Sequence, residues 1–146
     1  MQVGSLLTPD ITISKEMARW ARVRNTHLSR CVGAYYVSRH FQVIPSLRWS
    51  ELDDLDFVLE GIPKESIFSV GAYGSYRDLE LRETLELGLV QAVAKLQPQA
   101  VMIYGRIDER FKAQISKRTS VINFYHPLIN PSEEKLSRTD FNFDAA

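Results

Sequence analysis

The chain has 146 residues, which is enough for one ordinary domain and too short for two. Its 18 basic and 18 acidic side chains cancel, which argues against a bulk nucleic-acid coat protein and a polybasic membrane binder. Hydrophobic residues make up 45% of the sequence, enough for a packed core, and the single cysteine excludes an internal disulfide framework or a Cys-rich zinc site. Because the sequence shows neither an apolar run of membrane-spanning length nor a signal-peptide pattern at its start, we expect a cytoplasmic protein.

Residues 2–7 form the first short apolar segment and predict a strand. A long helical region is then predicted over residues 15–40, behind Ser14, and Gly33 is expected to break it into two pieces. The stripe that predicts its buried face contains Met17, Trp20, Arg24, Leu28, Cys31 and Tyr35. Cys31 is therefore expected to be a buried small hydrophobe and not a nucleophile.

A second strand is predicted at residues 42–47, followed by a short acidic helix over residues 51–60. The inward face of that helix is predicted to contain Leu52, Leu55 and Leu59. A Mg²⁺ site could be built from Asp53, Asp54 and Asp56, but a solvated helix face explains these carboxylates more simply. Three scattered histidines offer no transition-metal spacing, so no metal site is predicted.

The second half of the chain continues the alternation of short apolar and longer helical segments. Strands are predicted at residues 66–70, 100–104 and 120–124, and helices at residues 77–96 and 108–117. In the longer helix Asp78 is the expected cap, Pro98 follows the end, and the apolar stripe contains Leu81, Leu85, Leu89, Val93 and Leu96. The shorter helix is expected to turn Phe111 and Ile115 inward.

Strands that alternate with helical crossovers indicate parallel pairing. The sequence therefore predicts a single α/β domain over residues 1–126, with a mostly parallel five-stranded sheet covered by helices in βαβ repeats. Residues 127–146 are polar and are expected to form a flexible C-terminal tail.

Ligands of parallel α/β sheets bind where the carboxyl ends of the strands open on one edge. The residues that follow the predicted strands, and so are expected at this edge, are Asp10, Arg48, Trp49, Gly71, Tyr73, Gly74, Ser75, Gly105, Arg106 and His126. This set predicts a site for a nucleotide-like or other phosphate-bearing ligand, with no cofactor identified. Arg48 and Arg106 would hold the anion, Trp49 or Tyr73 would stack, the turn at residues 71–75 would supply amides and a hydroxyl, and Asp10 and His126 would transfer protons.

The turn Gly71-x-x-Gly74-Ser75 is neither a Walker loop nor a dinucleotide fingerprint, and a plain tight turn that joins a strand to a helix is the simpler explanation. Two further functions remain open. A non-enzymatic accessory protein would act through protein contacts, for example at Phe141-Asn142-Phe143 and the exposed faces of the basic helix. A nucleic-acid binder would use Arg19, Arg22 and Arg30, although a solvated basic face is the simpler interpretation for a neutral domain.

Several ordered stretches carry a resemblance to a known family. They are Pro9-Asp10-Ile11, Arg22-Val23-Arg24-Asn25, Gly33-Ala34-Tyr35-Tyr36, residues 43–50, residues 57–66, Ser69-Val70-Gly71, Leu96-Gln97-Pro98 and Ile103-Tyr104-Gly105. Over residues 9–125 the chain resembles the phage and bacterial family known as domain of unknown function 4417. The most specific parts are the strand end with Trp49 and the Gly-Ile-Pro-Lys-x-Ser stretch at residues 61–66. The resemblance implies a phage or bacterial origin, an intracellular location and a shortened version of the family's sheet, and it assigns no activity and no catalytic residue.

Overall fold

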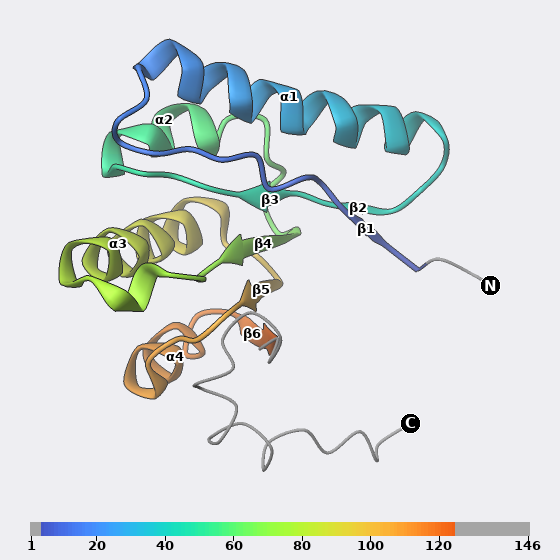
Figure 1. The fold of residues 1–146 in the computed structure, drawn as a ribbon. Coiled ribbons are helices and arrows are strands. Elements are labelled where there is room, and N and C mark those ends of the chain that lie inside the picture. Colours follow the sequence, from blue (N-terminus) through green and yellow to red (C-terminus); the bar gives the residue numbers. More distant parts are fainter. Residues whose placement is uncertain (1–3, 125–146) are drawn as a thin grey trace.

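The computed structural model describes residues 4–124, which form an α/β arrangement of parallel strands and helices (Figure 1). In chain order the elements are β1 (Leu6–Leu7), α1 (Arg19–Ser38), β2 (Val43–Ile44), β3 (Ser46–Leu47), the 3-10 turn η1 (Leu52–Asp54), α2 (Leu55–Val58), β4 (Ile67–Gly71), the 3-10 turn η2 (Ser75–Arg77), α3 (Leu79–Leu96), β5 (Ala100–Tyr104), α4 (Glu109–Ile115) and β6 (Ser120–Phe124). The predicted tail at residues 127–146 and His126 lie outside the described residues.

The strands form two parallel sheets, so the prediction of a single five-stranded sheet is wrong. One sheet pairs β1 with β2, and the other has the order β3-β4-β5-β6. The predicted strand at residues 42–47 is divided at Pro45, because proline has no N–H for a ladder hydrogen bond. Pro45 contributes its carbonyl oxygen, which accepts the Ser69 N–H at 2.9 Å.

Thr8 ties the two sheets and α1 together just beyond β1. Its Oγ1 accepts hydrogen bonds from the Ser46 N–H at 2.8 Å and from the Ser29 hydroxyl at 3.1 Å. The Ser46 hydroxyl in turn donates to the Thr8 carbonyl at 2.8 Å. Thr8 is buried, so these bonds satisfy polar groups that water does not reach.

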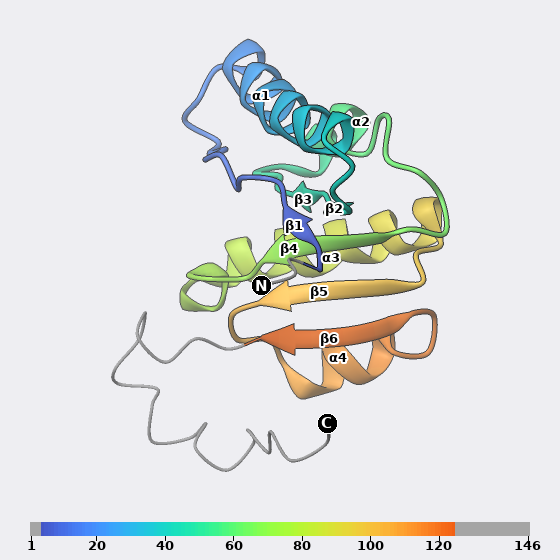
Figure 2. The same cartoon turned by 90° about the vertical axis from the view of Figure 1, so that its right-hand side faces the viewer.

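The larger sheet is covered by helices on one face. Strands in chain order with right-handed crossovers place successive helices on the same side, and α3 and α4 lie on one side of β4, β5 and β6 (Figure 1). The side chains that face these helices, including Phe68, Val70, Val101 and Ile103, are buried. On the opposite face no described helix covers the strands (Figure 2), and Ile67, Ile122 and Phe124 are exposed there.

The helix α3 confirms the prediction of a capped amphipathic helix at residues 77–96. Asp78 is its N-cap and accepts the Glu80 N–H at 2.8 Å and the Leu81 N–H at 3.2 Å. Leu85, Leu89, Val93 and Leu96 are buried in the core. Leu81, which lies in the first turn of α3, is exposed, against the prediction.

The strands at residues 100–104 and 120–124 have the predicted bounds, and the strand predicted at residues 66–70 lies one residue further along. α4 is capped by Asp108 and turns Phe111 and Ile115 into the core, as predicted. The acidic segment at residues 51–60 is shorter in its helical part than predicted, because it consists of η1 followed by the single turn of α2.

The helix α1 contradicts its predicted orientation. It runs unbroken through Gly33, and the stripe that predicts a buried face points outward, so that Trp20, Leu28, Cys31 and Tyr35 are exposed. The buried residues of α1 are instead Arg22, Ser29 and Gly33. Specific partners explain this orientation: Arg22 reaches the buried carboxylate of Asp54, Ser29 bonds to Thr8, and a Cβ at Gly33 would lie 2.8 Å from the Thr8 methyl carbon.

Candidate functional site

A cleft of about 350 Å³ opens at the carboxyl ends of β3 and β4, between the segment before α1 and the first turns of α3. Six of the residues that the sequence predicts as ligand-binding line it: Arg48, Trp49, Gly71, Tyr73, Gly74 and Ser75. Because all four strands of the larger sheet are parallel, these strand ends meet at the same edge. The cleft therefore lies where the topology of a parallel sheet places binding sites.

Arg48 and Asp10 form an ion pair beside the cleft. Arg48 Nη1 lies 2.9 Å from Asp10 Oδ2, and both side chains are partly open to solvent. Gly71 leaves room for this pair, since a Cβ at Gly71 would lie 3.2 Å from Asp10 Oδ2. Asp10 thus contacts the site through Arg48, and only Arg48 lines the cleft itself.

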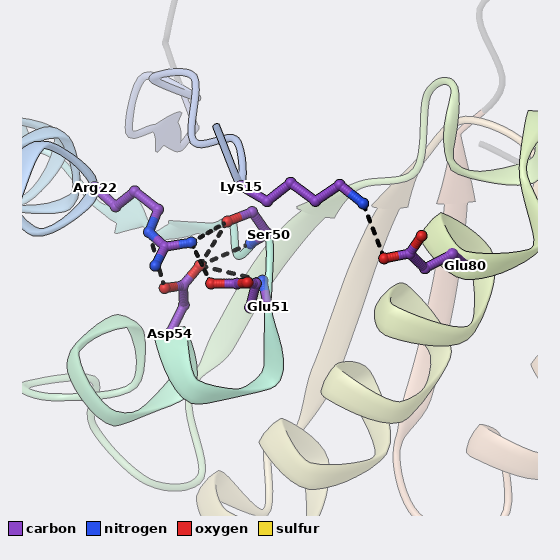
Figure 3. Close-up of polar contacts among 6 residues, drawn as sticks. All are labelled: Lys15, Arg22, Ser50, Glu51, Asp54 and Glu80. Carbon is purple, nitrogen blue, oxygen red and sulfur yellow. Dashed lines mark hydrogen bonds and ion pairs between the residues drawn. The ribbon is translucent and has the colours of Figure 1, made fainter. Parts of the chain in front are cut away.

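Lys15 adds a second cation that the sequence analysis does not predict. It lines the cleft, and its Nζ lies 2.9 Å from Glu80 Oε1 in the first turn of α3 (Figure 3). The hydrogen bond and the negative charge of Glu80 raise the pKa of Lys15, which keeps its ammonium group charged. A prediction based on the residues that follow strands misses Lys15, because Lys15 precedes α1 and lies at the cleft only in the folded chain.

Trp49 lines the cleft, but most of its side chain is buried in the core. Its side chain is 8% exposed, and its indole N–H donates to the Thr84 carbonyl at 3.0 Å. The indole packs directly on the backbone of α3 at Gly88, where a Cβ would collide with the ring. Tyr73, in contrast, is 40% exposed and presents the free aromatic surface of the site.

The glycine turn after β4 has the conformation that its sequence predicts, but the adjoining helix start is already occupied. Gly74 has a φ of 79°, a left-handed conformation that glycine adopts without strain. The Ser75 N–H donates to the Ala72 carbonyl at 3.2 Å. Because the Asp78 carboxylate accepts the first amides of α3, an anion at this helix terminus would compete with Asp78.

Gly105 and Arg106, the other predicted residues between residues 4 and 124, do not line the cleft. Gly105 has a φ of 110° and packs against the neighbouring turn, where its Cβ would lie 3.0 Å from the Tyr73 nitrogen. Its carbonyl oxygen accepts a hydrogen bond from Asn123 at 2.8 Å, which fixes the end of β5 to β6. Arg106 follows on the surface.

A buried polar network lies next to the cleft and was not predicted (Figure 3). Asp54 is completely buried, and its Oδ2 accepts hydrogen bonds from the Ser50 N–H at 2.9 Å, the Ser50 hydroxyl at 2.8 Å and the Glu51 N–H at 3.2 Å. Arg22 Nε lies 3.3 Å from Asp54 Oδ1, and Arg22 also bonds to Ser50 and Glu51. The hydrogen bond to Glu51 raises the pKa of Arg22 above its ordinary value. Asp54 is therefore part of the core and not of a solvated helix face.

Three arginines, Arg19, Arg22 and Arg30, are the predicted phosphate ligands of a nucleic-acid binder, and each contacts residues outside α1. Arg22 belongs to the buried network, and Arg30 donates to the Ser46 carbonyl at 3.3 Å and the Val58 carbonyl at 3.0 Å. The Arg19 guanidinium lies over the Phe57 ring, 5.3 Å from its centroid. This arrangement weighs against the use of these side chains as phosphate ligands.

Neither a cluster of metal ligands nor a membrane-spanning helix is found between residues 4 and 124. Within this range, no three histidine, cysteine, aspartate or glutamate side chains gather closely enough to hold a metal ion. None of the helices in the same range is both long enough and apolar enough to cross a bilayer.

The sequence is similar to one family model and to proteins of two phages. A family model described as Domain of unknown function (DUF4417) matches residues 1–125. The Gene 1 protein of Mycobacterium phage L5 is 34% identical over 106 residues, which cover 73% of this chain and 46% of that protein. The Gene 1 protein of Mycobacterium phage D29 is 32% identical over 105 residues, which cover 72% and 39%. The chain thus spans less than half the length of these curated relatives, and no solved structure matches it.

Proposed function

The chain belongs to the DUF4417 family, and from the geometry of its cleft we propose that it binds a small phosphate-bearing ligand at the strand-end edge. The observation that supports this most is the coincidence of the cleft with the predicted strand ends. Its volume of about 350 Å³ falls at the lower end of the range for small-molecule sites, which suits a ligand of mononucleotide size or smaller.

Two cations at the cleft, Arg48 and Lys15, are the proposed anion ligands. Each is paired with one carboxylate, Asp10 or Glu80, in an exposed ion pair. Exposed pairs of this kind contribute about 0–1 kcal/mol, so a phosphate group can replace the carboxylates at little cost. A phosphate offers more charge and more acceptor oxygens than one carboxylate, and the guanidinium of Arg48 can bind it through two parallel hydrogen bonds.

The other proposed contacts come from the turn after β4. Tyr73 supplies the exposed ring for a planar group such as a nucleobase, and Ser75 supplies a hydroxyl. Gly71 and Gly74 keep the cleft floor free of side chains. Trp49 contributes its edge, and Asp10 remains the proposed group for proton transfer if the ligand is also a substrate.

The experiment is a thermal-shift titration of the full chain with inorganic phosphate, pyrophosphate, AMP and ATP. A ligand at 100 times its Kd stabilises the native state by about 2.7 kcal/mol, which raises the Tm of a chain of this size by roughly 5–10 °C. Arg48→Gln is expected to remove most of that shift. Arg118→Gln, which neutralises an exposed arginine between α4 and β6, serves as the matched control and is expected to preserve it. No shift with any of the four ligands, or equal shifts in both variants, contradicts the proposal.

A further inference from the structure

The outer face of α1 is apolar, and no described residue covers it. Trp20 is 70% exposed and Tyr35 is 56% exposed, with Leu28 and Cys31 exposed between them at helical spacing. α1 is the outermost layer on its side of the molecule, so this face points away from the domain (Figures 1 and 2). We call the residues Trp20, Arg24, Leu28, Cys31 and Tyr35 the outer stripe.

The size of the outer stripe indicates an interaction surface. Aromatic side chains have about 150–250 Å² of surface each, so the exposed parts of Trp20 and Tyr35 alone amount to roughly 300 Å². This area is spread along about four turns of α1 and is comparable to the largest apolar patch of a typical monomer, about 300–600 Å², which is often a functional surface. The fold also anchors α1 through polar and small residues, Arg22, Ser29 and Gly33, which leaves the apolar residues for the outside.

The charges on the outer stripe limit the kind of partner that can bind it. Residues 17–50 contain no aspartate and no glutamate. Arg24 lies in the middle of the outer stripe, and the Arg39 guanidinium lies over the Tyr35 ring at its end, 5.3 Å from the centroid. The outer stripe itself contains apolar residues and a cation and no carboxylate, so it is complemented by a surface with apolar residues and carboxylates.

From these observations we propose that the outer stripe is the docking site for an acidic amphipathic helix of a protein partner. The stripe follows three- and four-residue spacing along a helix of 20 residues, about 30 Å long, which suits packing of one helix along another. A second copy of this chain that docked through its own outer stripe would bring the same cations and no carboxylate to pair with them. Insertion into a membrane surface uses a broad apolar face with many flanking cations, whereas the inner half of α1 is packed on the domain.

The test uses a synthetic 21-residue peptide with leucine at helical three- and four-residue spacing and glutamate at most other positions. A peptide of the same composition in scrambled order is the first control, and a peptide with lysine in place of glutamate is the second. Because Trp49 is buried and Trp20 is exposed, a blue shift of tryptophan fluorescence on titration into the full chain reports burial of Trp20. The glutamate peptide is expected to bind at least tenfold more tightly than either control, with affinity that falls as salt is added.

Charge reversal at the stripe gives the decisive comparison. Arg24→Glu is expected to weaken binding of the glutamate peptide at least tenfold and to strengthen binding of the lysine peptide, while Arg118→Glu changes neither. Circular dichroism establishes that both variants are folded. Equal affinities for the ordered and scrambled peptides, or no effect of Arg24→Glu, overturn the proposal.

Three further measurements test whether the outer stripe binds a second copy, a membrane surface or nucleic acid instead. A positive result in any of them, together with no binding of the glutamate peptide, would overturn the proposal. Sedimentation that shows self-association abolished by Trp20→Glu would assign the stripe to a second copy. A Trp20 blue shift with phosphatidylserine vesicles would assign it to a membrane surface. Retention of duplex DNA that is lost in Arg24→Glu would assign it to nucleic acid.

Discussion

Replacement of Arg22 by methionine tests the role of the buried network most directly. Methionine fills a similar volume and removes the charge, so Asp54 keeps its place in the core without a countercharge. Asp54 is completely buried and the Arg22 side chain is only 8% exposed, so water cannot take over the lost interaction. Neither Arg22 Nε nor Asp54 Oδ1 forms a hydrogen bond, so each atom depends on the charge of the other.

The magnitude follows from the partners that remain. Breaking a buried ion pair by removing one member costs about 3–5 kcal/mol. Asp54 Oδ2 retains its three hydrogen bonds from Ser50 and Glu51, which compensate part of the uncovered charge. We therefore expect Arg22→Met to lower the free energy of unfolding by about 3 kcal/mol, at the lower end of that range. The double variant with Asp54→Asn is expected to lose about 2 kcal/mol less than the sum of the single variants, because it leaves no isolated charge in the core.

Urea denaturation followed by far-UV circular dichroism measures these differences. Lys15→Met is the matched control, because it breaks an ion pair whose side chains are 46% and 71% exposed, and it is expected to destabilise the protein much less than Arg22→Met. If Arg22→Met and Lys15→Met destabilise the protein equally, burial does not set the strength of these pairs and the reasoning fails.

Two other predictions concern α3 and its surroundings. Gly88→Ala places a Cβ against the Trp49 indole and is expected to lower the free energy of unfolding by about 1–3 kcal/mol and to change the tryptophan fluorescence of the native state. Gly4→Ala, with open space around its Cβ, is the control, and an equally large effect there would contradict this reasoning. Burial, together with a hydrogen bond to Glu86, raises the pKa of Tyr76 to about 12 from its ordinary value of 10.0. The native state therefore favours the neutral phenol, so this contribution to stability is complete below about pH 10 and is lost as the pH rises toward 12. Denaturation at a series of pH values is expected to show a shallower decline in Tyr76→Phe, and an unchanged decline would refute the assignment.

The parts of the fold that depend on local pattern could be predicted from the sequence. The stripe of α3, its cap at Asp78 and the strands at residues 100–104 and 120–124 follow from spacing and capping chemistry that involve only neighbouring residues. The convergence of Arg48, Tyr73 and Ser75 on one edge also follows, because parallel strands open on the same side.

The parts that depend on distant partners could not be predicted in this way. The apolar stripe of α1 indicates a buried face, yet Arg22 and Ser29 find Asp54 and Thr8 on the other side of the helix, and those contacts determine its orientation. Lys15 likewise reaches the cleft only through the path of the chain before α1. Spacing along the sequence contains no information about such encounters.

The break at Pro45 has a consequence for how the molecule opens. A single run of five residues belongs to both sheets, with β2 held by β1 on one side of the proline and β3 held by β4 on the other. Thr8, the residue that follows β1, is hydrogen-bonded to Ser46 of β3 and to Ser29 of α1. Because separation of the small sheet would strain the chain of the large one, we expect the two sheets to unfold together, and not the N-terminal layer before the rest of the domain.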